Sequence, residues 1–306
     1  MIEPTLRTAK RIAKAALTNQ LAHFAPSFYM RLTGETGRGL GEESSGQAAS
    51  YFRACFDDYF AKLGVTPSQI SSFLAGKRVL EYGPGDVPGV ALLMIAYGAE
   101  SVVCVDRFPL LQLNQKNVAV IHDLLSGLGR SERQRATSCF LRNGDPATGF
   151  NPERIRYRIA PSGLSGLRDE IDLALSRAVL EHVNDLRATF ADMHAAMKRD
   201  AIAIHQVDLK SHGLHQTDLL DFLVWPDYLW RLMYSHKGAP NRLRVDSYRR
   251  VLAQTGFKVT SIEPTLLADP IEVQAVRAKL APPFRHISDE DMCCLGFWMV
   301  CSKKAD

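Results

Sequence analysis

From Lys77 onward, short apolar strands alternate with helices, and this alternation restricts the fold more than any other feature of the chain. The strand-like runs are KRVLEY, SVVCVD, RIRYRI, IDLALS and AIAIHQVDL, and predicted helices separate most of them. Strands that are joined through crossover helices form a parallel sheet that is covered on both faces. The sequence therefore predicts an α/β fold with a doubly wound sheet.

The C-terminal stretch breaks this alternation. VDSYRRVLAQTG predicts a helix, FKVTSIEP a strand, and CCLGFWMVCSK a long final strand after a loop with little helix of its own. A hairpin-like pair at the end of an otherwise parallel sheet sets the last strand antiparallel to its neighbours. We therefore expect seven strands with an antiparallel terminal strand.

The sequence divides into a helical N-terminal part and the alternating part. Residues 1–76 predict a helical cap, which contains a basic amphipathic stretch and a glycine-rich loop at 34–47, and residues 77–306 predict the sheet domain. An aromatic-rich insert at about 211–245 interrupts this domain. We expect the basic amphipathic helix to pack on the body with its charged face in solvent.

Composition excludes several classes of protein. The chain has 306 residues, a net charge of +4 and six scattered cysteines without a C-x-x-C pair, which argues against a zinc ribbon and favours reduced thiols in the cytoplasm. The sequence lacks a clustered basic face of the kind that predicts a nucleic-acid partner. No apolar run approaches the roughly 20 residues of a membrane span, so we expect no stable membrane insertion. A homo-oligomer stays open.

The stretch LEYGPGDVPG carries the clearest ligand signal. A strand that enters a helix through glycines lets a ligand approach the backbone closely. A dinucleotide fingerprint would need a third glycine where Pro88 stands, which counts against a nicotinamide cofactor. Glu81 lies at the strand end, where it suits a cationic group, and Asp106 ends the next strand, where acids accept hydrogen bonds from ribose.

Together these motifs resemble the class I S-adenosylmethionine-dependent methyltransferases. The resemblance rests on E-x-G-x-G after the first strand, the acid that ends the second strand, D-x-x-x-S in the fourth strand, and the following LEHV. It spans roughly residues 77–302 and implies a Rossmann-like seven-stranded sheet, an S-adenosyl-L-methionine cofactor and transfer of its methyl group. The cofactor-binding residues that it implies are Glu81, Gly83, Gly85, Asp86, Asp106, Arg107 and Ser176; Asp86 has a helix cap as its alternative role.

Two histidine-containing stretches follow the fourth and fifth strands. SRAVLEHV contains His182, and HQVDLKSHGLH contains His205, Asp208 and His212. Histidine is the commonest general base near neutral pH, so the three histidines are candidate catalytic bases, with Asp208 as a candidate catalytic partner that orients a histidine. Orienting the cofactor loop is the alternative role of His182, and a structural hydrogen bond at the strand end is that of His205. A metal site made of the last three is disfavoured because successive residues of a strand point to opposite faces, which separates His205 from Asp208, and we predict no metal.

The acceptor is expected to be a small molecule. Candidate substrate-binding residues are Arg177, Trp225, Tyr228, Arg242 and Arg244, with wall packing and salt links as their structural alternatives. We expect O-methylation of a small polar acceptor of glycan or natural-product type, assisted by a histidine base. N-methylation of a small amine, a catalytically inactive binding protein and, less favoured, a nicotinamide oxidoreductase are the alternatives.

Overall fold

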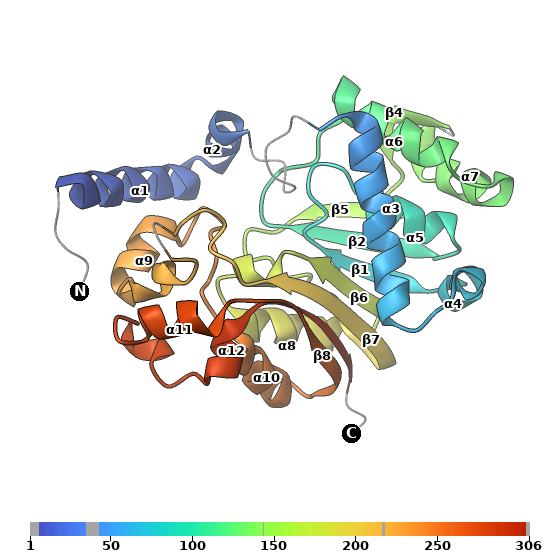
Figure 1. The fold of residues 1–306 in the computed structure, drawn as a ribbon. Coiled ribbons are helices and arrows are strands. Elements are labelled where there is room, and N and C mark those ends of the chain that lie inside the picture. Colours follow the sequence, from blue (N-terminus) through green and yellow to red (C-terminus); the bar gives the residue numbers. More distant parts are fainter. Residues whose placement is uncertain (1–5, 35–42, 143, 216–217, 304–306) are drawn as a thin grey trace. The chain divides into compact units, whose positions relative to one another are not determined.

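The computed structural model describes residues 6–34, 43–142, 144–215 and 218–303 (Figure 1). Most of the predicted loop at 34–47, and residues 216–217 of the predicted insert, lie outside these ranges. Within them, no helix combines the length and the apolarity needed to cross a membrane.

The main sheet has seven strands in the order β5-β2-β1-β6-β7-β9-β8. The strand β1 pairs in parallel with β2 and β6, and β2 pairs in parallel with β5. The last strand of the chain, β9, lies between β7 and β8, so the predicted seven-stranded Rossmann-like sheet is confirmed. The strand bounds are β1 (Arg78–Tyr82), β2 (Ser101–Asp106), β5 (Ile155–Ile159), β6 (Ile171–Arg177), β7 (Met197–Asp208), β8 (Phe257–Leu267) and β9 (Cys294–Lys303).

The chain forms two compact units. Unit 1 contains residues 1–33, 178–190 and 206–299, and unit 2 contains residues 34–177, 191–205 and 300–306. Each unit is therefore assembled from segments that are far apart in the sequence. The predicted sequence boundary between residues 76 and 77 stays a prediction.

Unit 2 surrounds the strands β1, β2 and β5 with helices and a small hairpin. Its helices are α3 (Ser45–Lys62), α4 (Ile70–Leu74), α5 (Gly89–Ala96), α6 (Gln115–Ser126) and α7 (Arg130–Thr137), and α8 (Leu186–Ala196) continues into it from unit 1. The hairpin joins β3 (Phe140–Arg142) to β4 (Asp145–Phe150). Every residue of α5 is buried, which explains why its sequence is almost wholly apolar.

Gly89 opens α5 at the point where α3 packs against it. An added Cβ at Gly89 would lie 2.4–2.8 Å from ring atoms of Phe52, a buried residue of α3. This contact explains why the residue after Pro88 is a glycine: the packing of α3 on α5 leaves no room for a side chain there.

We expect Gly89→Ala to destabilise the protein by about 1–3 kcal/mol, because overpacking a buried contact forces the ring or the helix to move. Denaturant unfolding measures the change. Phe52→Leu removes the clashing ring. In that background, Gly89→Ala should lower the free energy of unfolding by less than it does in the wild type. Strict additivity of the two changes would contradict this explanation.

Unit 1 has its own apolar core, to which the aromatic insert contributes. Its helices are α1 (Leu6–Phe24), α2 (Pro26–Thr33), α9 (Asp227–Tyr234), α10 (Val245–Gln254), α11 (Pro270–Arg277) and α12 (Asp289–Cys293). Trp225 and Trp230 are buried in this core together with residues of α11. The basic amphipathic helix α1 packs on α9, as predicted, and its buried Asn19 donates to the Leu232 carbonyl at 3.0 Å.

The prediction of little helix before the last strand was wrong, because α11 and α12 occupy part of that stretch. Asp269 caps α11 by accepting a hydrogen bond from the Ile271 amide at 2.8 Å, and Pro270 occupies its first turn. Val273 and Val276 then give the helix one face that is buried in the unit 1 core. The cap, the proline in the first turn and the short apolar face are weak signals in the sequence. The neighbouring prolines favour a loop, so the helix was not predicted.

Candidate active site

The glycine turn in unit 2 joins β1 to α5. In the parallel pair β1–β2, Glu81 lies opposite Cys104 and Tyr82 opposite Val105, so Glu81 and Asp106 both lie at the carboxyl ends of their strands. The turn glycines have φ values of 65° at Gly83 and 74° at Gly85. Glycine adopts this left-handed region without the penalty that a Cβ brings.

Glu81 is a buried carboxyl group. Its side chain accepts a long hydrogen bond from the Cys104 thiol, with 3.8 Å between Sγ and Oε2. Burial raises the pKa of Glu81 to about 8, an effect that the backbone of Ala91 opposes and the nearby Asp106 charge increases. A positively charged ligand group beside this carboxyl would favour its ionised form.

Asp106 is held by the loop that follows it. The Phe108 amide donates to Oδ1 at 3.1 Å. Burial raises the pKa of Asp106, while backbone groups of Phe108 and Gly85 and the Tyr157 hydroxyl lower it. The same Tyr157 hydroxyl donates to the Gly85 carbonyl at 3.1 Å, which links β5 to the glycine turn. Tyr157 was not singled out from the sequence, because nothing local connects a tyrosine in the third predicted strand to this turn.

Asp86 lies in the loop between β1 and α5, and Arg107 directly follows β2. Asp86 is buried and accepts a hydrogen bond from the Asn117 side chain of α6 at 3.2 Å. Pro88, not Asp86, is the N-cap residue of α5, so the helix-cap alternative for Asp86 was wrong. The guanidinium of Arg107 lies 5.5 Å from the centre of the Phe108 ring, and burial lowers its pKa.

His205 is fully buried in β7. Its Nδ1 lies 2.7 Å from the hydroxyl oxygen of Ser176 in β6, and this bond ties the two strands together. Burial lowers the pKa of His205 to about 3, so the imidazole is neutral at physiological pH. Ser176 therefore contacts a histidine, a link that the sequence did not reveal.

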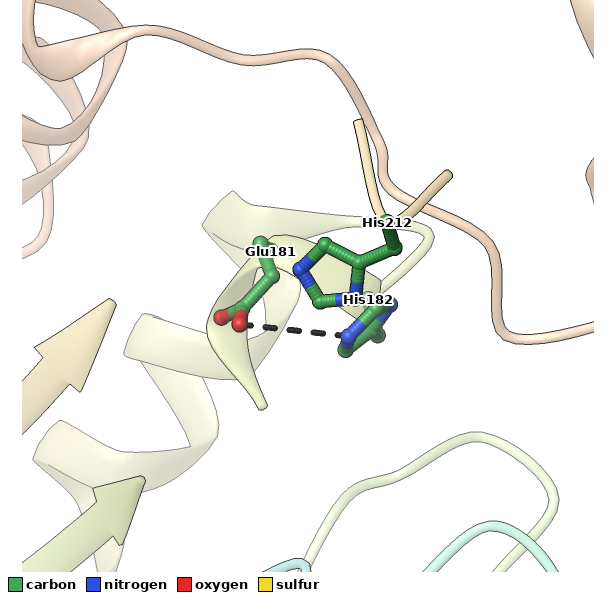
Figure 2. A group of neighbouring side chains, drawn as sticks. All are labelled: Glu181, His182 and His212. Atoms are coloured by element: carbon green, nitrogen blue, oxygen red, sulfur yellow. Dashed lines mark ion pairs between the residues drawn. The ribbon is translucent and has the colours of Figure 1, made fainter. Parts of the chain in front are cut away.

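In unit 1, three ligand-type side chains form what we call the Glu181 cluster: Glu181, His182 and His212. One donor atom from each lies within 4.8 Å of the others, and no other such group of three or more occurs in the parts of the chain that the structure describes. Figure 2 shows the three side chains pointing toward one another, with Glu181 and His182 on the short helix η2 (Leu180–His182) and His212 on a separate segment. The set predicted to be unsuited to a metal, with His205 and Asp208, is not gathered in this way.

The cluster is closely packed. His182 Nε2 lies 3.8 Å from a carboxyl oxygen of Glu181, and the two imidazole rings meet edge to face with centres 4.8 Å apart. Asp208 Oδ2 lies 3.8 Å from His212 Nε2, while its carboxyl group also pairs with Lys210 at 3.1 Å. Burial lowers the pKa of His182 to about 4 and lowers that of His212 as well, so both rings are neutral.

A family model described as a methyltransferase domain matches residues 53–262, which is more than half of the chain. The chain belongs to this family. A search of curated proteins finds no match. Among solved structures, an S-adenosylmethionine-dependent methyltransferase from Mesorhizobium loti is 18% identical, with a TM-score of 0.43, and the match covers 75% of this chain and 92% of that one. Phosphoethanolamine N-methyltransferase 2 from Haemonchus contortus, in complex with S-adenosyl-L-methionine, is 16% identical with a TM-score of 0.40, covering 76% and 49%.

The residues of unit 2 fit the cofactor of this methyltransferase, S-adenosyl-L-methionine. Glu81 is a buried carboxyl group suited to an ammonium group, and Asp106 ends the next strand with acceptor oxygens suited to ribose hydroxyls. Gly83 and Gly85 have no side chains that would hold a ligand away from the backbone. When bound, the cofactor supplies a sulfonium methyl group that is ready for transfer.

Most of the predicted acceptor-binding side chains of the methyltransferase make protein contacts. Arg177 donates to Asp58 at 2.7 Å, and Arg242 is buried against the Trp225 carbonyl at 2.6 Å and Asp227 at 3.0 Å. Arg244 is fully buried, donating to the carbonyls of Leu209, Met292 and Cys294.

These contacts give each arginine a structural role. The aromatic pair differs, because Trp225 is buried in the unit 1 core whereas Tyr228 is 71% exposed. The predicted acceptor-binding roles of all five residues stay predictions.

Proposed function

We propose that this methyltransferase O-methylates a small polar acceptor and that the Glu181 cluster accepts the proton of the attacking hydroxyl. A hydroxyl must lose its proton on attack, and a positioned base contributes about 10²–10⁴-fold to the rate. The observation that carries the proposal is the cluster itself: two neutral imidazoles next to a buried carboxyl group, on the segments that follow β6 and β7.

Glu181 strengthens the case for proton uptake. Burial raises the pKa of its carboxyl group well above the ordinary value, which makes the ionised form a better proton acceptor than an exposed carboxylate. His182 Nε2 lies 3.8 Å from it, so a proton taken up by the imidazole lies next to a second acceptor. An amine acceptor needs less help of this kind, and the cluster therefore favours a hydroxyl.

We assign His205 a positioning role rather than that of the base. It is fully buried, and its Nδ1 is engaged with the Ser176 hydroxyl. Its bond to Ser176 holds the ends of β6 and β7 together within unit 2.

The cysteines support a proposal for the cellular setting. All six are free, and five of them are buried. Unpaired cysteines suit a reducing compartment, so the proposed place of action is the cytoplasm, on a small-molecule acceptor.

We expect His212→Asn to lower turnover by about 10²–10⁴-fold with unchanged affinity for S-adenosylmethionine, because the variant lacks one proton acceptor of the cluster. His212 has a φ of 51°, and asparagine tolerates this left-handed conformation, so the loop should keep its path. Labelled methyl transfer to a panel of sugars, phenols and amines measures turnover and identifies the methylated atom.

His215→Asn is the matched control for this loop, since His215 bonds to Ser211 and lies outside the cluster. It should retain wild-type turnover. Wild-type turnover in His212→Asn, or methylation of amines alone, would contradict the proposed reaction.

A further inference from the structure

We propose that the Glu181 cluster binds a divalent transition-metal ion of the Zn²⁺ type. Two imidazoles and one carboxylate form the ligand set of many catalytic zinc sites, which keep a fourth position for water or substrate. Here the three donors come from two separate segments and converge, with their donor atoms within 4.8 Å of one another (Figure 2). Zinc ligands lie about 2.0–2.2 Å from the metal, so a bound ion would draw the three side chains closer together.

The buried carboxyl group of Glu181 is an independent observation that points to a cationic ligand. The residue is only 1% exposed, and among the described residues neither carboxyl oxygen has a partner that satisfies hydrogen-bond distance and angle limits. Backbone groups of Glu181 and Asp208 lie near it without meeting these limits. Burying an unpaired carboxylate is costly, and a coordinated metal ion removes that cost.

The surrounding charges do not supply such a cation. The ammonium group of Lys210 lies near enough to Glu181 to interact with its charge, but it pairs with Asp208 at 3.1 Å. Tyr248, also buried, lies near Glu181. The carboxyl group thus faces neutral rings, a phenol and a second acid, which is a setting that favours a divalent ion.

The protein also holds the first two ligands in place. The backbone amide of Asn241 donates to the Glu181 carbonyl at 2.6 Å. The side-chain amide of the same residue donates to the carbonyls of Leu180 and Val183 at 2.9 and 3.1 Å. These three bonds fix η2, on which Glu181 and His182 sit. Asp208, 3.8 Å from His212 Nε2, can orient the third ligand, as carboxylates do for metal-bound histidines.

The ligand chemistry selects the class of ion. Mg²⁺ and Ca²⁺ prefer oxygen ligands, whereas imidazole suits Zn²⁺, Fe²⁺, Ni²⁺ and Cu²⁺. This inference rests on the proposed function for its role in the reaction: a bound ion would engage the imidazole lone pairs and would instead lower the pKa of a coordinated hydroxyl, whose proton would pass to solvent. Metal binding itself does not depend on that role.

Titration calorimetry of chelator-treated protein with ZnCl₂ tests the proposal, with MgCl₂ as the comparison. We expect one tight zinc site and no tight magnesium site. His182→Asn and His212→Asn should each weaken zinc binding at least 100-fold, and Glu181→Gln should do so as well. Thermal unfolding of each variant without metal shows whether it is folded.

His236→Asn is the matched control, because His23 and His236 form another histidine pair in unit 1, with ring centres 4.1 Å apart. It should leave the tight site intact. Absence of a tight zinc site in the wild type, or its loss only in His236→Asn, would overturn the proposal. A visible absorption band on Co²⁺ addition, expected in the wild type, keeps the test decisive if a cluster variant fails to fold.

Turnover separates this proposal from the proposed function. If zinc does not bind and chelator leaves turnover intact, while His212→Asn loses turnover, the metal site is refuted and the proton-acceptor role stands. If zinc binds tightly but turnover is unchanged in chelator and in His212→Asn, the metal site stands and the proposed role of the cluster in the reaction fails.

Discussion

Replacing Asp106 with alanine should weaken binding of S-adenosylmethionine by about 10²–10⁴-fold. A carboxylate that accepts two ribose hydroxyls makes two charge-assisted hydrogen bonds, each contributing about 1.5–3 kcal/mol, and about 1.4 kcal/mol corresponds to a tenfold change in affinity. Asp106 ends β2 beside the glycine turn, and its oxygens lie near the amides of Phe108 and Gly85. Calorimetric titration with the cofactor measures the loss.

Two further variants make this result specific. Asp106→Asn keeps an oxygen for the Phe108 amide but lacks the charge, so its affinity should fall between those of the wild type and the alanine variant. Asp123→Ala removes an acid from α6, in the same unit, and should bind the cofactor like the wild type. Undiminished binding by Asp106→Ala would show that the ribose is held elsewhere.

Cofactor affinity should also fall by about tenfold for each pH unit below pH 8. Glu81 has a pKa of about 8 because it is buried, so it is largely protonated in the free protein below that pH. Pairing with the methionine ammonium group requires the ionised form, and binding must then release a proton. Above about pH 8 an α-amino group loses its own proton, so affinity should peak near pH 8.

Glu81→Gln provides the comparison for this pH profile. Glutamine has no proton to release, so the variant should bind weakly and lose the slope between pH 6 and 8. In the wild type the folded pKa of Glu81 lies above its unfolded value, so its stabilising effect is lost as pH rises through 8. At pH 9 the variant should therefore unfold at a temperature no lower than that of the wild type. A wild-type slope in Glu81→Gln would assign the proton to another group.

The sequence predicted the sheet well because strand and helix periodicity are local properties. β1, β2, β5 and β6 match the predicted apolar runs, and Glu81 and Asp106 lie at the strand ends where the motif requires them. It failed where a short segment depends on distant partners. Capping and one buried face form α11, and the hairpin β3–β4 depends on pairing across a turn.

The candidate site shows the same division. His182 and His212 could be named from their positions after two strands, but their convergence on Glu181 depends on two loops folding together. The burial of Arg244 against three backbone carbonyls was equally hidden, because its partners lie 35 to 50 residues away in the sequence. Residue types indicated the chemistry, and only the tertiary structure identified the neighbours.

A crystal structure with S-adenosylhomocysteine bound tests the central claim most directly, because it shows which groups hold the cofactor. We predict that the Asp106 carboxylate accepts hydrogen bonds from the ribose hydroxyls and that the Glu81 carboxyl group faces the amino group, with the chain passing close to Gly83 and Gly85. A ligand bound away from the glycine turn, or bound there with both carboxyl groups turned from it, would contradict the account.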